Sequence, residues 1–251
     1  MKKNKKKLNK KKIIILIILI LGIYIFYNKN ISHRSNKLIS QITETSDYKV
    51  IKEDTNINYS GKGQEKVKNK DGYFTTFTTS ENRKKTYIEY KQNGSSWGDK
   101  EYWGGTMSEN GCGITAVATI LSGYNKQYTP DDLRQKYYPV LDYDLLSEEL
   151  SSTFNIKTSG FYYDSVHLSK ENLQEHLHTN RPVLICVWNQ PKNNRWTTSS
   201  HYMVLLASDN SDMVYISNPN GGENDIKSSG WYNFKEVIPY IAKAIYIESY
   251  N

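Results

Sequence analysis

Cys112 lies between two glycines, immediately before a run of apolar residues with the spacing of an amphipathic helix. The sequence reads Asn110-Gly111-Cys112-Gly113, and the apolar residues that follow fall at 114, 117, 118 and 121. This spacing predicts a helix that begins at the cysteine. Unpaired N–H groups and the helix dipole at such a start are expected to lower the pKa of a thiol. The flanking glycines would let the backbone turn sharply and let a substrate approach closely. Cys112 is therefore a candidate nucleophile, and the alternative is a cysteine that packs as a small apolar residue.

A cysteine nucleophile needs a base, and His201 is the best candidate among the five histidines. It opens a predicted strand over 201–208, which a turn-forming segment joins to a second strand over 213–218. A turn centred between Asp209 and Asn210 places His201 opposite Asn218, whose amide could hold the imidazole. A slip of one residue would change the face. The alternative for Asn218 is a plain turn residue, because Asn-Pro-Asn-Gly-Gly favours turns throughout.

The other four histidines and Cys186 are expected to lie outside the candidate site. His33 lies beside the N-terminal apolar run, and the residues at 167, 176 and 178 are predicted to be solvated on or near a helix over 170–178. Cys186 falls inside an apolar run that reads as a buried strand. A disulfide between the two cysteines is conceivable in an oxidising compartment. We expect instead two free thiols, with Cys112 reactive and Cys186 packed.

Metal and phosphate chemistry have little support in the sequence. It contains no Cys-x-x-Cys or His-x-x-x-His pair, and its Gly-Gly pairs lack the lysine or helix pattern of a phosphate loop. We therefore expect no metal and no cofactor.

The elements that must position these residues indicate an α+β fold. The Cys112 helix should end near Ser122-Gly123, and Thr129-Pro130 has the residues of a helix cap and first turn. Further helices are predicted over 144–151 and 170–178. Strands are predicted over 87–90, 182–189, 201–208, 213–218 and 242–249. Helices first and a mainly antiparallel sheet afterwards are typical of α+β proteins.

The positive charge of the chain is confined to its N-terminus. The formal net charge is +7, but residues 1–34 hold ten Lys/Arg and no acidic residue, which leaves 23 basic and 26 acidic residues in the rest. Nucleic-acid binding therefore loses its main electrostatic support.

The N-terminal sequence predicts a membrane anchor. An uncharged run from Ile13 to Tyr27, rich in Ile and Leu, follows the lysine block and ends in aromatic residues. The alternative is a cleaved signal peptide, but no small-residue cleavage site is evident. We predict a cytoplasmic basic tail (1–12), a transmembrane signal-anchor (13–28), a polar stalk (29–85) with a strand near 72–78, and an extracytoplasmic domain (86–251).

Several motifs, in order over roughly residues 86–250, resemble the double-glycine, bacteriocin-processing-like cysteine peptidases of the papain-like clan. They are Tyr90-Lys91-Gln92 with Trp97, Asn110-Gly111-Cys112-Gly113-Ile114-Thr115-Ala116, Tyr128-Thr129-Pro130, His201-Tyr202-Met203-Val204 and Asn218-Pro219. The resemblance implies a papain-like fold, and it implies that Gln92 completes the oxyanion hole. The third group of the family is often Asp before Pro, so Asn218 departs from that pattern and would orient His201 with an amide.

The resulting hypothesis is a membrane-anchored thiol hydrolase that cleaves peptide bonds outside the cell through Cys112, His201, Asn218 and Gln92. Its partners would be a peptide or protein substrate and the membrane. The leader processing of classical members is not carried over, because we expect this domain to face outward. Two alternatives stay open: a hydrolase of peptidoglycan stem peptides, and a catalytically silent binding module that keeps the fold.

Overall fold

The computed structural model describes residues 65–69, 72–79, 85–190, 195–220 and 229–250. The predicted basic tail (1–12), the predicted anchor (13–28) and most of the predicted stalk (29–85) lie outside the described residues. The described residues all fall within one compact unit, Ile57–Asn251. None of the helices in the described ranges is long and apolar enough to cross a membrane.

A six-stranded sheet forms the centre of this unit, and all of its neighbouring strands are antiparallel. Its order is β10-β9-β8-β7-β11-β6. The bounds are β10 (Gly230–Asn233), β9 (Met213–Ser217), β8 (Ser200–Ser208), β7 (Val183–Trp188), β11 (Ile241–Tyr250) and β6 (Ile156–Tyr162). The predicted strands over 182–189, 201–208, 213–218 and 242–249 are confirmed within a residue or two, whereas β6 and β10 were not predicted.

The helices confirm the α+β prediction. They are α2 (Met107–Asn110), α3 (Cys112–Ser122), α4 (Pro130–Lys136), α5 (Leu146–Phe154) and α6 (Lys170–His178). Thr129 caps α4 with a capping box and Pro130 stands in its first turn, as the sequence predicted. The short α2 was not predicted, nor were the 3-10 turns η2 (Phe234–Glu236) and η3 (Ile238–Tyr240).

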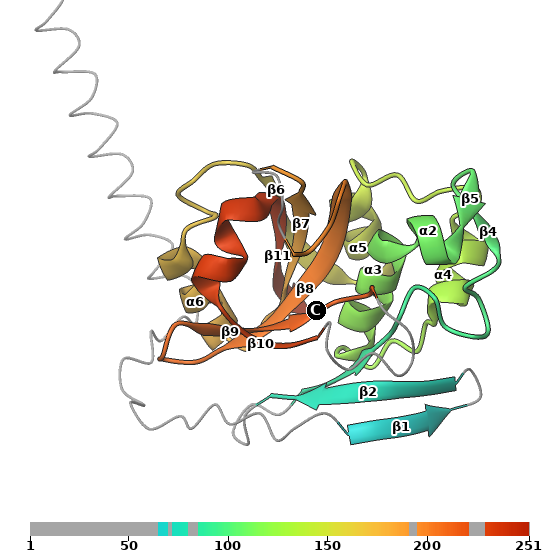
Figure 1. The fold of residues 1–251 in the computed structure, drawn as a ribbon, viewed down its shortest axis with the longest axis horizontal. Coiled ribbons are helices and arrows are strands. Elements are labelled where there is room, and N and C mark those ends of the chain that lie inside the picture. Colours follow the sequence, from blue (N-terminus) through green and yellow to red (C-terminus); the bar gives the residue numbers. More distant parts are fainter. Residues whose placement is uncertain (1–64, 70–71, 80–84, 191–194, 221–228, 251) are drawn as a thin grey trace, which may run out of the picture. The chain divides into compact units, whose positions relative to one another are not determined.

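The two faces of the sheet bury two separate apolar cores. Alternate residues of β8 divide between them: Val204 and Leu206 pack with α3 and α5, and Met203 and Leu205 pack with α6 and the 3-10 turns. Figure 1 shows α3 and α5 on one side of the sheet and α6 on the other.

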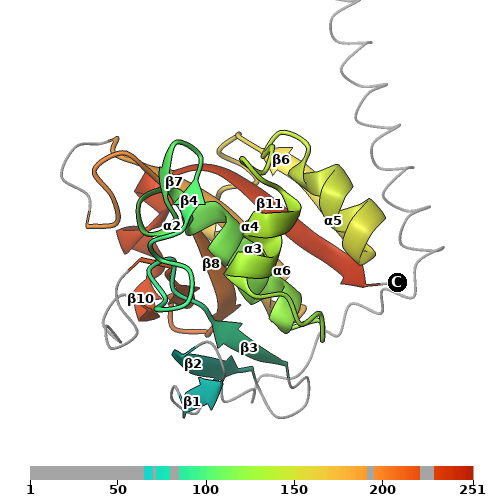
Figure 2. The same cartoon turned by 90° about the vertical axis from the view of Figure 1, so that its right-hand side faces the viewer.

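α3 is the central helix of the first core. All of its residues between Cys112 and Ser122 are buried, and the two end residues keep partial exposure. The helix packs against β8 and β3 (Figure 2). The glycines beside Cys112 serve close packing, because a Cβ at Gly111 would lie 2.5 Å from the carbonyl oxygen of Met107 and one at Gly113 would lie 2.3 Å from Oη of Tyr143.

A second, three-stranded sheet consists of β1 (Glu65–Asn69), β2 (Gly72–Thr78) and β3 (Thr86–Glu89). The strands predicted near 72–78 and 87–90 are confirmed. Phe77 of β2 is buried, and its ring stacks on Tyr215 of β9 at a centroid distance of 3.8 Å. The segment predicted as a stalk therefore contains, at its C-terminal end, two strands and a core residue.

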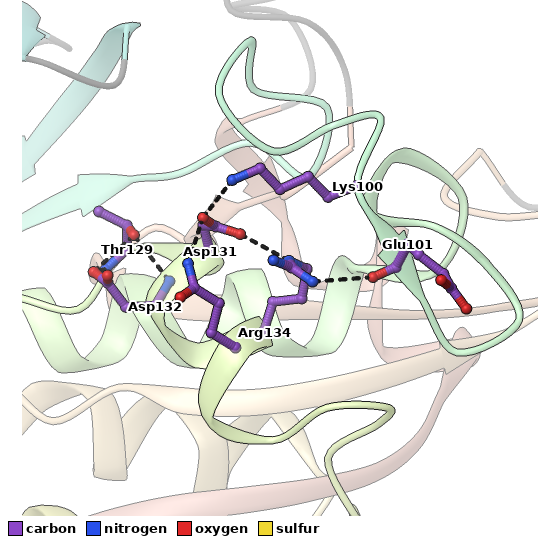
Figure 3. A network of polar contacts seen from close by, with 7 residues as sticks. Lys100, Glu101, Thr129, Asp131, Asp132 and Arg134 are labelled. Carbon is purple, nitrogen blue, oxygen red and sulfur yellow. Dashed lines mark hydrogen bonds and ion pairs between the residues drawn. The ribbon is translucent and has the colours of Figure 1, made fainter.

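A small hairpin, β4 (Glu101–Tyr102) and β5 (Gly105–Thr106), precedes α2 and is joined to α4 by polar contacts (Figure 3). Asp131 of α4 forms ion pairs with Lys100 at 2.6 Å and Arg134 at 2.7 Å. Arg134 also donates to the carbonyl oxygen of Glu101 at 3.4 Å. The chain that leads into Cys112 is thus held against α4 by charged hydrogen bonds.

Candidate active site

The partly exposed N-terminal residue of α3 is Cys112. Cys112 and Cys186 are both free thiols, and Cys186 is buried in β7, as predicted. The N–H group of Tyr202 is directed at the Cys112 sulfur. This N–H belongs to the peptide group that joins His201 to Tyr202, so the sulfur lies beside the backbone of the candidate base. The ring of Tyr202 stacks on Tyr143 at 4.8 Å, and this pair forms an aromatic wall beside the thiol.

The expectation that the helix start lowers the pKa of Cys112 is wrong. Burial raises the pKa of the thiol above its usual value, and the N–H groups of Tyr202, Gly113 and Cys112 itself only partly offset this effect. Desolvation of a thiolate outweighs the helix-terminal N–H groups at this position. The resting group is therefore a neutral thiol.

His201 and Asn218 are in direct contact. Both side chains are buried, and His201 Nε2 lies 2.7 Å from Asn218 Oδ1. The N–H of Asn220 also donates to this Oδ1, at 2.9 Å. A backbone N–H can only donate, so the Asn218 oxygen is the acceptor in both contacts. Nε2 of His201 therefore carries its proton, and Nδ1 of the neutral imidazole keeps a free lone pair.

The register that led to this contact was wrong by two residues, although the contact itself exists. The predicted hairpin would place Val204 opposite Tyr215, but Val204 lies opposite Ser217. A bulge between Leu205 and Ala207 then shifts the pairing by one further residue. A two-residue shift keeps each side chain on its face, and Asn218 lies beyond the end of β9, where its side chain turns back to His201.

Burial lowers the pKa of the His201 imidazole below its usual value. The hydrogen bond to Asn218 opposes this shift, and the nearby charge of Lys91 adds to it. The base of the site is therefore neutral over the physiological range. Within the described residues no hydrogen bond joins the Cys112 thiol to this imidazole, and catalytic hydrogen bonds often form only when substrate is bound.

Gln92 is buried and links the segments that carry the nucleophile and Asn218. Its N–H donates to the carbonyl oxygen of Pro219 at 2.9 Å. Its side-chain Nε2 donates to the carbonyl oxygen of Ser108, in α2, at 2.5 Å. The side-chain NH₂ has a second proton, and the Oε1 atom has no hydrogen-bond partner among the described residues. An amide N–H is thus held close to the start of α3.

α3 itself positions the strand that delivers Gln92. Ser122 Oγ accepts the N–H of Ile88 at 2.8 Å, and Thr119 Oγ1 accepts the N–H of Tyr90 at 3.3 Å. The edge of β3 is therefore attached to α3 through hydroxyl groups within an otherwise apolar helix. One helix fixes the cysteine at its first residue and the glutamine through its last turns.

Two further polar residues of the site were not identified from the sequence. Lys91 and Ser229 are buried and contact the backbone of Asn218. The position of Lys91 directly before Gln92 was the one sequence feature that could have pointed to the lysine, and nothing in the sequence pointed to Ser229. No group of three or more His, Cys, Asp or Glu side chains in the described part of the chain could hold a metal ion.

His176 differs from its predicted solvated position. It packs against Tyr246 at a centroid distance of 4.6 Å, and burial lowers its pKa to about 4. This histidine lies on α6, which packs on the other face of the sheet from α3.

Two comparisons with known proteins found matches to this chain. The model of the Peptidase_C39 like family matches residues 86–243. A solved structure from Bacillus anthracis, described as a C39-like peptidase, is similar at a TM-score of 0.43 and 14% identity, over 57% of this chain and 91% of that chain. No curated protein matches the sequence. Because the family model spans more than half of the chain, with Cys112, His201 and Asn218 inside the match, the protein belongs to the Peptidase_C39 like family.

Proposed function

We propose that the protein is a cysteine peptidase that hydrolyses peptide bonds outside the cell, anchored by its N-terminal apolar segment. The observation that carries the proposal is the buried hydrogen bond between His201 and Asn218, beside a cysteine at a helix start. Nucleophile, base and orienting amide are the three groups that a thiol hydrolase requires. Membership of a peptidase family supports the same reaction.

The chemistry starts from a neutral pair. The Cys112 thiol transfers its proton to Nδ1 of His201 as the sulfur attacks the substrate carbonyl carbon. The imidazolium then donates this proton to the leaving amine, and a thioester with Cys112 remains. Water attacks the thioester, with His201 as base, and releases the acid and the thiol.

Asn218 and Gln92 have separate roles in this scheme. Asn218 accepts the Nε2 proton and so leaves the lone pair of Nδ1 available for the thiol proton. The second side-chain N–H of Gln92 and the N–H of Cys112 stabilise the oxyanion of the tetrahedral intermediate, an interaction whose loss typically costs about 10²–10³ in rate. No step requires a metal or a cofactor.

The test uses the purified full-length chain in detergent. A thiol-directed epoxide should label Cys112, as read by mass spectrometry of the digest, and labelling should abolish cleavage of a proteome-derived peptide library. Cleavage of purified peptidoglycan without cleavage of the library would favour the stem-peptide alternative. Absence of both activities in protein with an accessible Cys112 would support a silent binding module and reject the proposal.

A further inference from the structure

Lys91 is a buried lysine next to the groups proposed for catalysis. Its residue is 5% exposed, although lysine side chains are rarely buried unless they are paired. Nζ donates to the carbonyl oxygen of Asn218 at 2.6 Å, to Ser229 Oγ at 3.1 Å and to the carbonyl oxygen of Asn220 at 3.5 Å. An ammonium has three N–H groups and no acceptor, so Lys91 acts as a donor in each of these contacts.

These contacts fix the peptide groups on both sides of the Asn218 side chain. Ser229 Oγ accepts the N–H of Asn218 at 2.9 Å, and Lys91 binds its carbonyl oxygen. The backbone of Asn218 is therefore held by a lysine and a serine from distant parts of the sequence. The Oδ1 atom is left directed at Nε2 of His201.

Lys91 and its neighbour Gln92 also hold the segment at 91–92 against the segment that carries Asn218. The N–H of Gln92, the next residue, donates to the carbonyl oxygen of Pro219. The carbonyl oxygen of Lys91 in turn accepts the indole N–H of the buried Trp97 at 2.8 Å. The chain at 91–92 therefore joins the segment at 218–219 through both a side chain and the backbone.

We propose that Lys91 is a positioning residue of this site, which holds Asn218 against His201 and supplies a fixed positive charge beside the imidazole. The proposal rests on the peptidase function proposed above. Lys91 reaches Nε2 of His201 only through Asn218, and it acts on the orientation and the charge state of the base.

The charge of Lys91 has a defined consequence for His201. A cation near an imidazole opposes its protonation, and the charge of Lys91 contributes to the lowered pKa of His201. Among the described residues, the groups that contact Lys91 Nζ are the carbonyl oxygens of Asn218 and Asn220 and the hydroxyl of Ser229, all of them neutral. A further carboxyl group, Glu89 of β3, is buried and accepts a hydrogen bond from Tyr215 at 3.0 Å.

The variants separate position from charge. Lys91→Met removes the hydrogen bonds to Asn218 and the charge, whereas Lys91→Arg keeps the charge. Ser229→Ala removes the hydroxyl that binds the Asn218 N–H and Lys91 Nζ and leaves the charge unchanged. Lys85→Met is the matched control, because Lys85 is a partly buried lysine that directly precedes β3, with its Nζ over the Tyr124 ring, whereas Lys91 follows β3. Far-ultraviolet circular dichroism and thermal unfolding confirm that each variant is folded.

Two measurements do not depend on peptide hydrolysis. NMR titration of His201 gives its pKa, and the pH dependence of Cys112 alkylation by iodoacetamide reports the coupled thiol. We expect Lys91→Met to raise the pKa of His201, while Lys91→Arg and Lys85→Met leave it near the wild-type value and Ser229→Ala does not raise it, because the hydrogen bond to Asn218 itself supports protonation of His201. An unchanged titration in folded Lys91→Met would overturn the proposal even if the protein is an active peptidase.

Kinetics test the positioning role. Loss of alignment at a catalytic group typically costs roughly 10- to 100-fold in rate, so Lys91→Met and Ser229→Ala should lower kcat by about this factor with little change in KM. If Lys91→Met does not fold, a fall in kcat of Ser229→Ala without an upward shift in the His201 titration supports the positioning of Asn218 by these contacts, and an unchanged kcat rejects it. Unchanged kcat in Ser229→Ala and Lys91→Met would reject the positioning role. If no variant or wild type hydrolyses peptides, the function fails while the titration still decides the role of Lys91.

Discussion

At the scale of single residues, burial determines the protonation state in which the site rests. It raises the pKa of the Cys112 thiol and lowers the pKa of the His201 imidazole. Both shifts disfavour a thiolate–imidazolium ion pair in the free protein. The His201 imidazole must therefore be neutral and the Cys112 thiol protonated for the reaction to begin, and both conditions hold between the two shifted pKa values.

The pH dependence of activity follows from these directions. The kcat/KM should rise as the pH increases through the lowered pKa of His201, below the ordinary imidazole range near 6.5. It should fall only as the pH passes the raised pKa of Cys112, above the ordinary thiol range near 8.5. A pH–rate profile with a peptide substrate measures both limits. An alkaline limit below the ordinary thiol range would contradict the neutral pair.

Cys112 and Cys186 should respond differently to the same substitution. Cys112→Ala should abolish hydrolysis and leave folding intact, because the thiol at the start of α3 carries chemistry rather than packing. Cys186→Ala should retain activity once folded and lose stability by about 1–3 kcal/mol, because Cys186 is packed in β7. Chemical denaturation and steady-state kinetics on both variants check this. Loss of activity in folded Cys186→Ala would place the second thiol in the site.

Asn218 should act on catalysis through His201. Asn218→Ala removes the acceptor of the Nε2 proton, so kcat should fall with little change in KM. Asn218→Asp should retain much of the activity and raise the pKa of His201, because a carboxylate stabilises the imidazolium. The acidic limb of the pH profile should therefore move to higher pH. An unchanged kcat in folded Asn218→Ala would leave a Cys112–His201 dyad.

At the scale of elements, the ion pair between Asp131 of α4 and Lys100, the residue before β4, fastens the β4–β5 hairpin to α4 (Figure 3). Burial opposes ionisation of Asp131, but hydrogen bonds from Lys100, Arg134 and Gln135 outweigh it and lower its pKa. A lowered carboxyl pKa contributes stability that is present above the unfolded-state value near 3.9 and is lost as the pH falls through the folded value.

We therefore expect Asp131→Asn to lower the free energy of unfolding at pH 7 by about 1 kcal/mol. The difference from wild type should shrink as the pH falls below about 4. Urea denaturation at several pH values measures both effects. Glu148→Gln, at an exposed position in the first turn of α5, is the control and should change stability little. A difference that persists at pH 2 would show that Asp131 acts through something other than its charge.

At the scale of the whole molecule, the N-terminal sequence predicts a single membrane span with the C-terminal domain outside the cell. The predicted span (13–28) lies outside the described residues. Protease added to intact cells should degrade the domain that contains Cys112 and spare only the lysine-rich end, because positive residues stay in the cytoplasm. Immunoblots with antibodies against each end of the chain show which end survives the protease. A mature chain that starts near residue 30 and accumulates in the medium would establish a cleaved signal peptide instead.

The sequence by itself was enough to predict α3 to α6, the strands β2, β3, β7, β8, β9 and β11, and the candidate residues Cys112 and His201, but not β6, β10 or α2. Apolar spacing predicted α3, proline and capping residues predicted the start of α4, and β-type runs predicted β7, β8, β9 and β11. These signals are local, because helix and strand periods and capping hydrogen bonds involve residues close in sequence. The same locality allowed Cys112 and His201 to be selected as candidates, each by its place at the start of an element.

Only the tertiary structure decided how these residues act on one another. The position of the turn after Ser208 and the bulge in β8 together set the register, and burial reversed the expected pKa shift of Cys112. Long-range packing also brought Lys91 to the backbone of Asn218 and buried Phe77 of β2 on Tyr215. Desolvation and contacts of this kind depend on segments far apart in the chain. No window of sequence contains both partners, so only the assembled fold could determine them.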